Sequence, residues 1–259
     1  MRVFIEGVGV VGPGLEGWPE ARSILAGVAQ YEARPVRLQP PPLLPPAERR
    51  RAGATVMLAI AAGTEALAQA GRDPAEMAMV FAASGGDGET VHEILSVLAS
   101  PQRKVSPTRF HNSVHNAPSG YWSVATGSRA PSTSLCAFDD SFAAGMLEAA
   151  VQVTVQDCPV TLVAYDVPYP EPLHAARPIV SAFGMALVLL PRRTERVLAS
   201  LTVTTAAAAS PATTMTDPEL ERLRLGNPAA RALPLLATMA RADAGTIRLG
   251  EIDIAVAPL

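Results

Sequence analysis

The stretch that decides the fold is residues 131–146, which read PSTSLCAFDDSFAAGM. Its first part alternates in the manner of a β-strand, over residues 132–137, and its second part begins a helix of small and apolar residues. A strand that runs directly into a helix presents the free N–H groups of the first helical turn at one point in space. We call this turn, residues 136–141, the elbow. Its central residues are Phe138, Asp139 and Asp140, and the functional question is whether they are reactive.

The composition indicates a folded chain with a sizeable core. The 259 residues are 49% hydrophobic and the mean hydropathy is +0.22, which suits one large domain or two small ones. Charged residues make up 17% and the net charge is −3. This balance indicates neither a nucleic-acid surface nor a polybasic membrane patch. Proteins and small molecules are therefore the expected partners.

The sequence favours a cytoplasmic location. Cys136 and Cys158 sit in apolar surroundings without metal-ligand spacing, which suits a reducing compartment better than a disulfide framework. The apolar run at the start contains Glu6 and no small-residue cleavage site follows it, so we expect no signal peptide. No apolar run approaches the ~18 residues of a spanning helix, so we expect no membrane span.

The remaining patterns predict an α/β domain. Strands are expected at residues 3–11, 77–83, 160–164 and 185–190, and helices at 16–25, 46–70, 91–98, 112–127 and 142–155. The proline-rich residues 34–46 are expected to form a surface loop or a covering arm. Strands that alternate with helices favour a buried, largely parallel sheet. After Pro191 the pattern weakens and breaks at Ser210-Pro211, so we expect a domain over residues 1–190 and a packed C-terminal extension over 191–259.

Three passages share the pattern of one enzyme family. They are residues 3–13 (VFIEGVGVVGP), residues 66–71 (ALAQAG) and residues 116–150, in which Gly120, Gly127, Pro131-Ser132, Ser141 and Ala149-Ala150 fall in step with the family without a gap. On these passages the chain, from about residue 2 to residue 190, resembles the N-terminal half of β-ketoacyl synthases, the condensing enzymes of the thiolase fold. The resemblance implies a thiolase-like half fold, with a mixed, largely parallel sheet flanked by helices.

The resemblance also implies that the catalytic nucleophile is missing. In active condensing enzymes the elbow holds a cysteine whose thiolate the helix N-terminus stabilises, and that position is Asp139 here. A carboxylate is a poor acyl carrier because a mixed anhydride hydrolyses more readily than a thioester. A helix N-cap role is favoured for Asp139 or Asp140. Cys136 lies in the expected strand, where we expect a buried, inert thiol. Condensing enzymes also use histidines or an asparagine from a second half, and no histidine follows His174.

Other constellations are weaker. His111 and His115 are four residues apart, but no third ligand accompanies them, so we expect neither a metal nor a cofactor. The glycine-rich loop at residues 84–88 lacks the ending of a phosphate loop. Ser113 and Ser119 lack the Gly-x-Ser-x-Gly pattern of a hydrolase.

Dimerisation is expected through the strand before the elbow. In the family that the chain resembles, this strand pairs across a two-fold axis with its copy in a second protomer, and an unpaired edge is a hazard. The neighbouring aromatics Tyr121 and Trp122 suit either core or interface. The expected interface residues are Ser113, Tyr121, Trp122, Ser132, Ser134 and Cys136. The expected residues of an acyl tunnel or pocket are Phe138, Asp139, Asp140, Phe110 and His111.

The resemblance thus implies a non-catalytic ketosynthase-like subunit. Its partner would be a full-length, active ketosynthase, as for the chain-length factors of type II polyketide and aryl polyene systems, with acyl groups supplied by an acyl carrier protein in polyketide or fatty-acid-type biosynthesis. The alternative is a stand-alone homodimeric enzyme, with acyl-transfer or decarboxylating activity on acyl carrier protein substrates and Asp139, His111 or His115 as acid–base groups. A binding module for acyl groups or carrier protein is a third interpretation.

Overall fold

The computed structural model describes residues 1–206 and 211–258. Its strands are β1 (Arg2–Gly12), β2 (Leu15–Glu16), β3 (Ala78–Ala82), β4 (Ser132–Leu135), β5 (Val160–Asp166), β6 (Phe183–Leu190), β7 (Ala199–Thr205), β8 (Gly245–Leu249) and β9 (Ile252–Pro258). Its α-helices are α1 (Trp18–Leu25), α2 (Pro46–Arg49), α3 (Ala54–Ala70), α4 (Gly88–Ala99), α5 (Pro107–Asn112), α6 (Ala117–Thr126), α7 (Ser141–Gln156), α8 (Leu173–Ala176), α9 (Pro218–Gly226) and α10 (Leu233–Arg241). Two 3₁₀-helices, η1 (Phe138–Asp140) and η2 (Ala229–Ala232), complete the elements of these residues.

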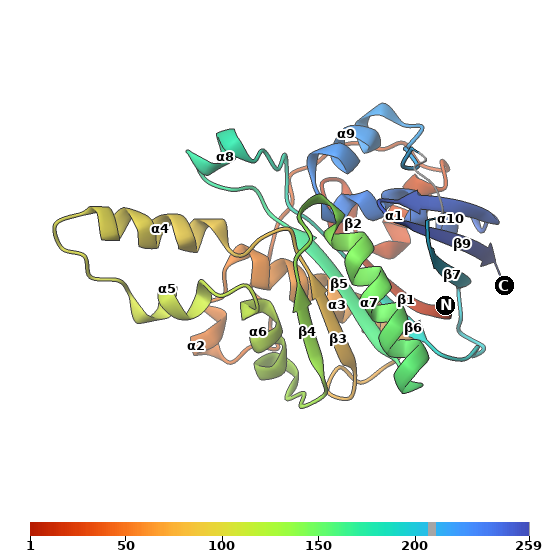
Figure 1. Cartoon of the computed structure of the whole chain (residues 1–259), viewed down its shortest axis with the longest axis horizontal. Coiled ribbons are helices and arrows are strands. Elements are labelled where there is room, and N and C mark those ends of the chain that lie inside the picture. The colour runs from red at the N-terminus through yellow and green to blue at the C-terminus, as the bar shows by residue number, and fades with distance from the viewer. Residues whose placement is uncertain (207–210, 259) are drawn as a thin grey trace.

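Within these residues one mixed sheet organises the chain (Figure 1). The strand order is β4-β3-β5-β6-β1-β7-β9-β8, and β2 pairs with the end of β1. Parallel pairing joins β3 to β4 and to β5, and the other neighbours are antiparallel. The expected α/β architecture with a mixed sheet is confirmed. The sheet is not largely parallel, however, because parallel pairing is confined to β3, β4 and β5 and the C-terminal strands add antiparallel pairs.

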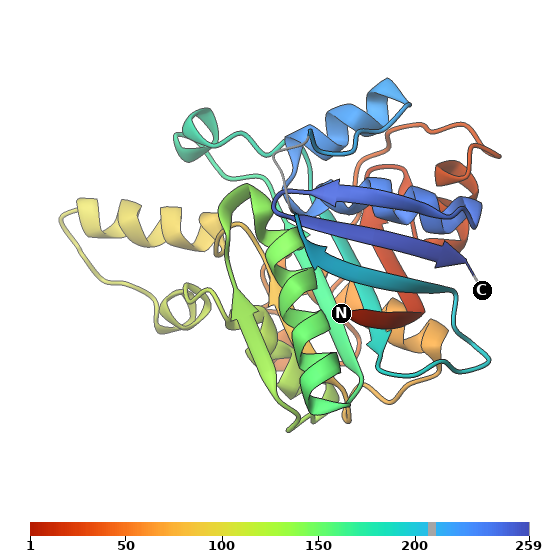
Figure 2. The same cartoon turned by 45° about the vertical axis from the view of Figure 1, so that its right-hand side comes forward.

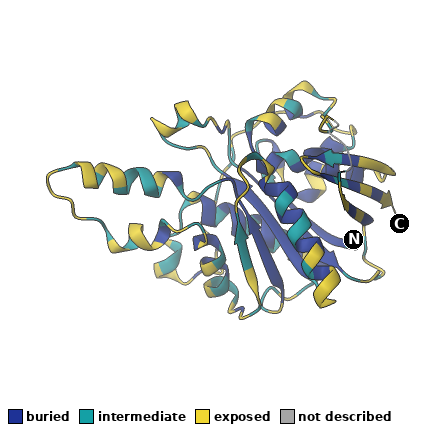
Figure 3. Cartoon of the chain, viewed as in Figure 1, coloured by how far each residue is buried: buried dark blue, intermediate teal, exposed yellow. Residues whose placement is uncertain are grey.

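Helices cover both faces of the sheet, because its central strands are apolar throughout. Every residue of β3, β5 and β6 is buried, and Figure 3 shows these strands as the buried centre of the molecule. Helix α3 packs against β1 and β6, and helix α7 packs against β5 and β3. The expected helix over residues 46–70 is two helices, because the backbone of Gly53 is extended and separates α2 from α3. None of the helices in the described residues is long and apolar enough to cross a membrane.

The C-terminal segment adds three strands to the same sheet. Strand β7 pairs with β1, β9 with β7, and β8 with β9. On its outer side β8 is hydrogen-bonded at Arg248, since Thr213 N donates to Arg248 O (3.0 Å) and Arg248 N donates to Thr213 Oγ1 (2.9 Å). The boundary near residue 190 stays a prediction, and the expected break at Ser210-Pro211 includes Ser210, which lies outside the described residues.

A helical hairpin projects from the body of the protein. Figures 1 and 2 both show α4 and α5 extending away from the sheet. We call residues 88–112 the arm. Gly88 is the one buried residue of α4, and Asn112 is the one buried residue of α5. The arm therefore leaves apolar side chains uncovered, notably Leu95, Leu98 and Phe110.

The close approach of α3 to β1 depends on glycine. A Cβ added at Gly9 would lie 2.1 Å from the backbone oxygen of Ala62. We expect Gly9→Ala to lower the free energy of unfolding by at least ~2 kcal/mol, because the helix must move away from the strand. Gly120→Ala is the matched control. A Cβ at Gly120 would meet nothing within 4 Å, so in helix α6 it should stabilise the protein by about 0.5–1 kcal/mol. Urea denaturation measures both, and equal effects of the two substitutions would contradict the packing argument.

Candidate functional site

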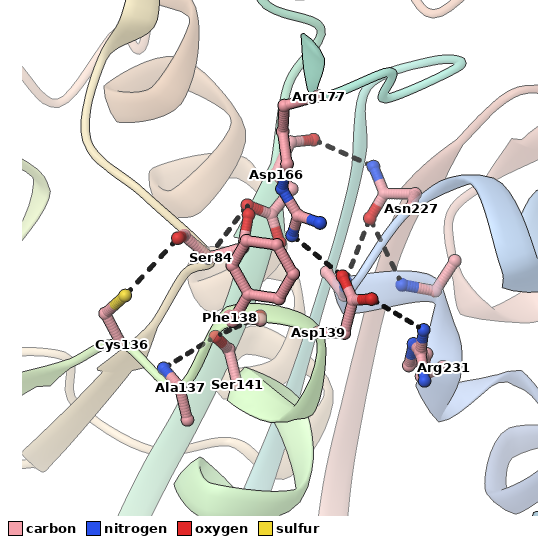
Figure 4. A network of polar contacts seen from close by, with 12 residues as sticks. Ser84, Cys136, Ala137, Phe138, Asp139, Ser141, Asp166, Arg177, Asn227 and Arg231 are labelled. Carbon is pink, nitrogen blue, oxygen red and sulfur yellow. Dashed lines mark hydrogen bonds and ion pairs between the residues drawn. The ribbon is translucent and has the colours of Figure 1, made fainter.

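The elbow lies where the parallel strands β3, β4 and β5 end (Figure 4). The carboxyl ends of parallel strands lie side by side at one end of a sheet, and this is the usual place for a binding or catalytic site in α/β folds. Strand β4 ends at Leu135, and η1 leads directly into α7. Phe138 has a φ of +53°, an uncommon conformation for a residue with a side chain. Ser141 fixes this turn, because its hydroxyl accepts from Ala137 N (3.0 Å) and donates to Phe138 O (2.8 Å).

Asp139, the residue at the expected nucleophile position, is paired with two arginines. Its Oδ1 lies 2.8 Å from Arg177 Nη2, and its Oδ2 lies 3.1 Å from Arg231 Nη2. Arg177 comes from the loop between β5 and β6, and Arg231 comes from η2. The expected N-cap position is occupied by Asp140, which precedes α7, but its side chain makes no capping hydrogen bond. Asp139 caps neither η1 nor α7.

Arg177 also covers the aromatic ring beside Asp139. Its guanidinium carbon lies 3.5 Å from the centroid of the Phe138 ring, in cation–π geometry. Nη2 of Arg177 is buried, and its contact with Asp139 is an ion pair without hydrogen-bond geometry. The Phe138 side chain remains 60% exposed on its other side. A charged group and a ring therefore stand together at the expected nucleophile position.

Asp166, at the end of β5, is a buried acid next to this cluster. Its Oδ1 accepts from Ser84 N (2.9 Å) and from Ser84 Oγ (2.6 Å), whereas Oδ2 finds no hydrogen-bond partner among the described residues. Burial raises the pKa of Asp166 from 3.8 to about 7, against the opposing effects of Ser84 and Arg177. The carboxyl group therefore holds its proton up to neutral pH.

This raised pKa predicts a pH dependence of stability. A carboxyl group whose pKa is higher in the folded state stabilises the fold fully below about pH 4, and the stabilisation is lost as the pH rises through about 7. Asp166→Asn keeps an acceptor for Ser84 and removes the titration. In wild type, the free energy of unfolding should fall between pH 4 and pH 8. We expect this fall to be smaller by ~2–4 kcal/mol in Asp166→Asn.

Chemical denaturation at several pH values measures this slope. Asp157→Asn is the matched control, because Asp157 is an exposed carboxylate paired with Arg192 at the surface. The control should keep the wild-type slope. A slope that is the same in wild type and Asp166→Asn would show that Asp166 is ionised throughout.

The expected burial of Cys136 is wrong. The thiol is exposed, because β4 ends one residue before it. Its Sγ donates to Ser84 O at 3.3 Å, on the β3 side of the elbow. Figure 4 shows it apart from the Asp139 cluster.

The structure divides the expected tunnel residues into two groups. Phe138, Asp139 and Asp140 come together at the elbow, whereas Phe110 and His111 belong to α5 of the arm. The His111 ring packs edge-on against Tyr121, with 6.3 Å between centroids, and the His115 ring nitrogen lies 3.5 Å from Ala83 O. No three His, Cys, Asp or Glu side chains of the described residues form a group that could hold a metal ion.

The elbow contains little free space. The cavity between Asp139, Asp140, Arg231 and Gly250 measures about 10 Å³, roughly one water molecule. A larger cavity of about 450 Å³ lies elsewhere, between the proline-rich residues 36–43 and helix α3. Among the described residues, side chains therefore leave room for about one water molecule in the cavity beside Asp139 and Asp140.

The sheet edge at β4 is open. Pro131 O and Leu135 O accept from Met79 N (3.0 Å) and Ala83 N (3.2 Å) of the β3 segment. Because the backbone groups of a strand alternate in direction, Ser132 and Ser134 point theirs toward the open edge. By contrast, Tyr121 and Trp122 are 3% and 1% exposed and lie in the core, so they are not available as surface. Ser113, at the end of α5, is partly exposed.

Some residues of the site could not be identified from the sequence. Asp166 had a weak signal, as an acid directly after an apolar strand. Arg177, Arg231 and Asn227 had none, because they come from a loop and from a segment without a matching pattern.

Comparison with known families gives one match. The family described as β-ketoacyl synthase, N-terminal domain, matches residues 18–237. No curated protein matches the chain.

Solved structures of similar fold include complexes of ketosynthases. A ketosynthase (ApeO) in complex with its chain length factor (ApeC) from Xenorhabdus doucetiae matches at 22% identity, with a TM-score of 0.73 and 99% of both chains covered. The ishigamide ketosynthase/chain length factor matches at 15% identity, with a TM-score of 0.69 and 99% of both chains covered. AntDE:AntF, a type II PKS acyl-carrier protein in complex with its ketosynthase, matches at 13% identity, with a TM-score of 0.74 and coverage of 100% of this chain and 99% of that one. At these identities the likeness shows the fold alone, and the expected thiolase-like half fold is confirmed.

Proposed function

The chain belongs to the β-ketoacyl synthase N-terminal domain family, and from that premise we propose that it is a non-catalytic subunit that pairs with a full-length ketosynthase. In this role it acts like a chain length factor and takes part in polyketide or fatty-acid-type biosynthesis in the cytoplasm. An acyl carrier protein delivers the acyl groups to the pair.

The observation on which the proposal rests is the state of Asp139. At the position where active relatives have a nucleophile, each carboxylate oxygen faces a guanidinium group, of Arg177 or of Arg231. A carboxylate held in this way does not form the acyl-enzyme that condensation requires. The subunit therefore needs a partner to supply the chemistry.

Two surfaces suit that partner. The backbone groups of Ser132 and Ser134 point to an open sheet edge, and such edges are normally paired or covered. The arm adds exposed apolar side chains, with Leu95 60% and Phe110 69% exposed, which is typical of a protein–protein surface. Solved complexes of ketosynthases with chain length factors share this fold, which supports a ketosynthase as the partner.

A proline at the open edge tests the interface. Ser134→Pro removes an outward N–H and leaves the bonds to β3 in place, because Pro131 and Leu135 face β3. We expect the variant to fold and to copurify with the ketosynthase at least ~10-fold less than wild type, since strand pairing across the dimer is interrupted. Affinity copurification and size-exclusion chromatography measure the complex.

Ser134→Thr is the matched control, because it keeps the N–H and suits a strand. It should pair like wild type. Undiminished copurification of Ser134→Pro would place the interface elsewhere. A chain that forms homodimers and binds no ketosynthase would contradict the proposal.

The elbow residues Phe138, Asp139 and Asp140 would border the acyl tunnel of the assembled pair. In that case, Phe138→Ala removes the exposed ring and should lengthen the products, as measured by mass spectrometry of the chains made by the reconstituted pair. Val155→Ala, an exposed apolar residue on α7, is the control and should leave product length unchanged. Unchanged products from Phe138→Ala would exclude a tunnel that ends at this ring.

No observation favours the alternative of a stand-alone enzyme. It requires Asp139, His111 or His115 as acid–base groups, and the carboxylate of Asp139 is occupied by arginines.

A further inference from the structure

Asp139 connects three segments that are distant in the sequence. It lies in the elbow, Arg177 lies in the loop after β5, and Arg231 lies in η2 near the C-terminus. We call residues 167–182 and 227–232 together the lid. Figure 4 shows both parts of the lid meeting the carboxylate of Asp139 from different sides.

The base of the lid is joined by a buried amide. Asn227 is fully buried, and its Nδ2 donates to Asp166 O (3.1 Å) and to Ser181 O (2.8 Å), at the two ends of the loop. Its Oδ1 accepts from Ala229 N (2.9 Å) and Ala230 N (3.3 Å), which starts η2. The two parts of the lid are therefore fixed to each other at the base, independently of Asp139.

The part of the lid that faces Asp139, around Arg177 and Arg231, is held in place by charge. Arg177 and Arg231 approach the same carboxylate, so without Asp139 their two positive charges would face each other across the elbow. The nearby Arg224 is matched by Glu221, at 2.6 Å, and does not need Asp139. Asp166 is kept protonated by burial up to about pH 7, so it offers little compensation.

We propose that Asp139 is a positioning residue that locks the lid over the elbow. The aspartate presents one negatively charged carboxylate oxygen to each arginine, and Arg177, held in this way, covers the Phe138 ring. A neutral side chain at this position could not hold both guanidinium groups. The residue that replaces the nucleophile thereby closes the site that a nucleophile would need open.

Hydrogen exchange on the full-length chain tests the lock. In Asp139→Asn we expect amides near the two arginines, in residues 173–177 and 231–232, to exchange about tenfold faster than in wild type, while the amides bonded to Asn227 and those of β3 and β5 keep their protection. Asp157→Asn, which breaks a surface ion pair with Arg192, is the matched control and should leave the lid unchanged. Because Asp139 is 38% exposed, 1 M NaCl should speed exchange in the wild-type lid and have little effect in Asp139→Asn.

A second variant keeps the elbow sequence intact. Arg231→Met should speed the exchange of residues 231–232. The double variant with Asp139→Asn should exchange no faster there than Asp139→Asn alone, because each change removes the same ion pair between Asp139 and Arg231. Wild-type protection of the lid in Asp139→Asn, or equal loss of protection over the whole chain, would overturn the lock. So would additive effects of the two changes. The measurement needs no partner, so its failure would leave the proposed pairing with a ketosynthase untouched.

Discussion

The structure around the elbow depends on one carboxylate, that of Asp139, which lies between the guanidinium groups of Arg177 and Arg231. Asp139 joins the elbow to a loop and to the C-terminal segment, and each of those segments is anchored elsewhere by neutral hydrogen bonds through Asn227. The ion pairs are partly exposed, so each pair alone is worth only about 1 kcal/mol or less. Their importance lies in geometry, because they determine which side chains stand at the end of the parallel strands.

The positions of the two proposed partner surfaces follow from the same strand arrangement. The order β4-β3-β5 places the strand before the elbow at the border of the sheet, so an interface through β4 would lie directly beside the site. The arm is inserted after β3, the strand next to β4, and its helices bury little of their own surface. A partner that covers β4 and the arm would also reach the exposed face of Phe138. Assembly and pocket shape would then be controlled by neighbouring residues.

Local sequence patterns predicted much of the fold, but they could not predict contacts between segments that are far apart in the sequence. The buried strands were predictable because their residues are uniformly apolar, and Asp139 was identified by counting from Pro131-Ser132 in the family pattern. Cys136 was misplaced because β4 ends at Leu135, two residues earlier than its alternation suggests. Tyr121 and Trp122 were assigned to an interface because large adjacent aromatics suit both interface and core. Arg177 and Arg231 could not be predicted, since nothing in a loop sequence indicates which carboxylate it will meet.

The two borders of the sheet differ in a way that limits assembly. Within the described residues, β8 is bonded to Thr213 on its outer side, whereas β4 presents its backbone to solvent. A sheet that can be extended at both borders can polymerise without limit, as fibrils do. A sheet with one unpaired border strand can pair with only one further strand, so two such chains form a closed dimer. The hydrogen bonds between Thr213 and Arg248 make β8 less suited to a further strand than β4, so pairing through β4 alone would keep an assembly finite.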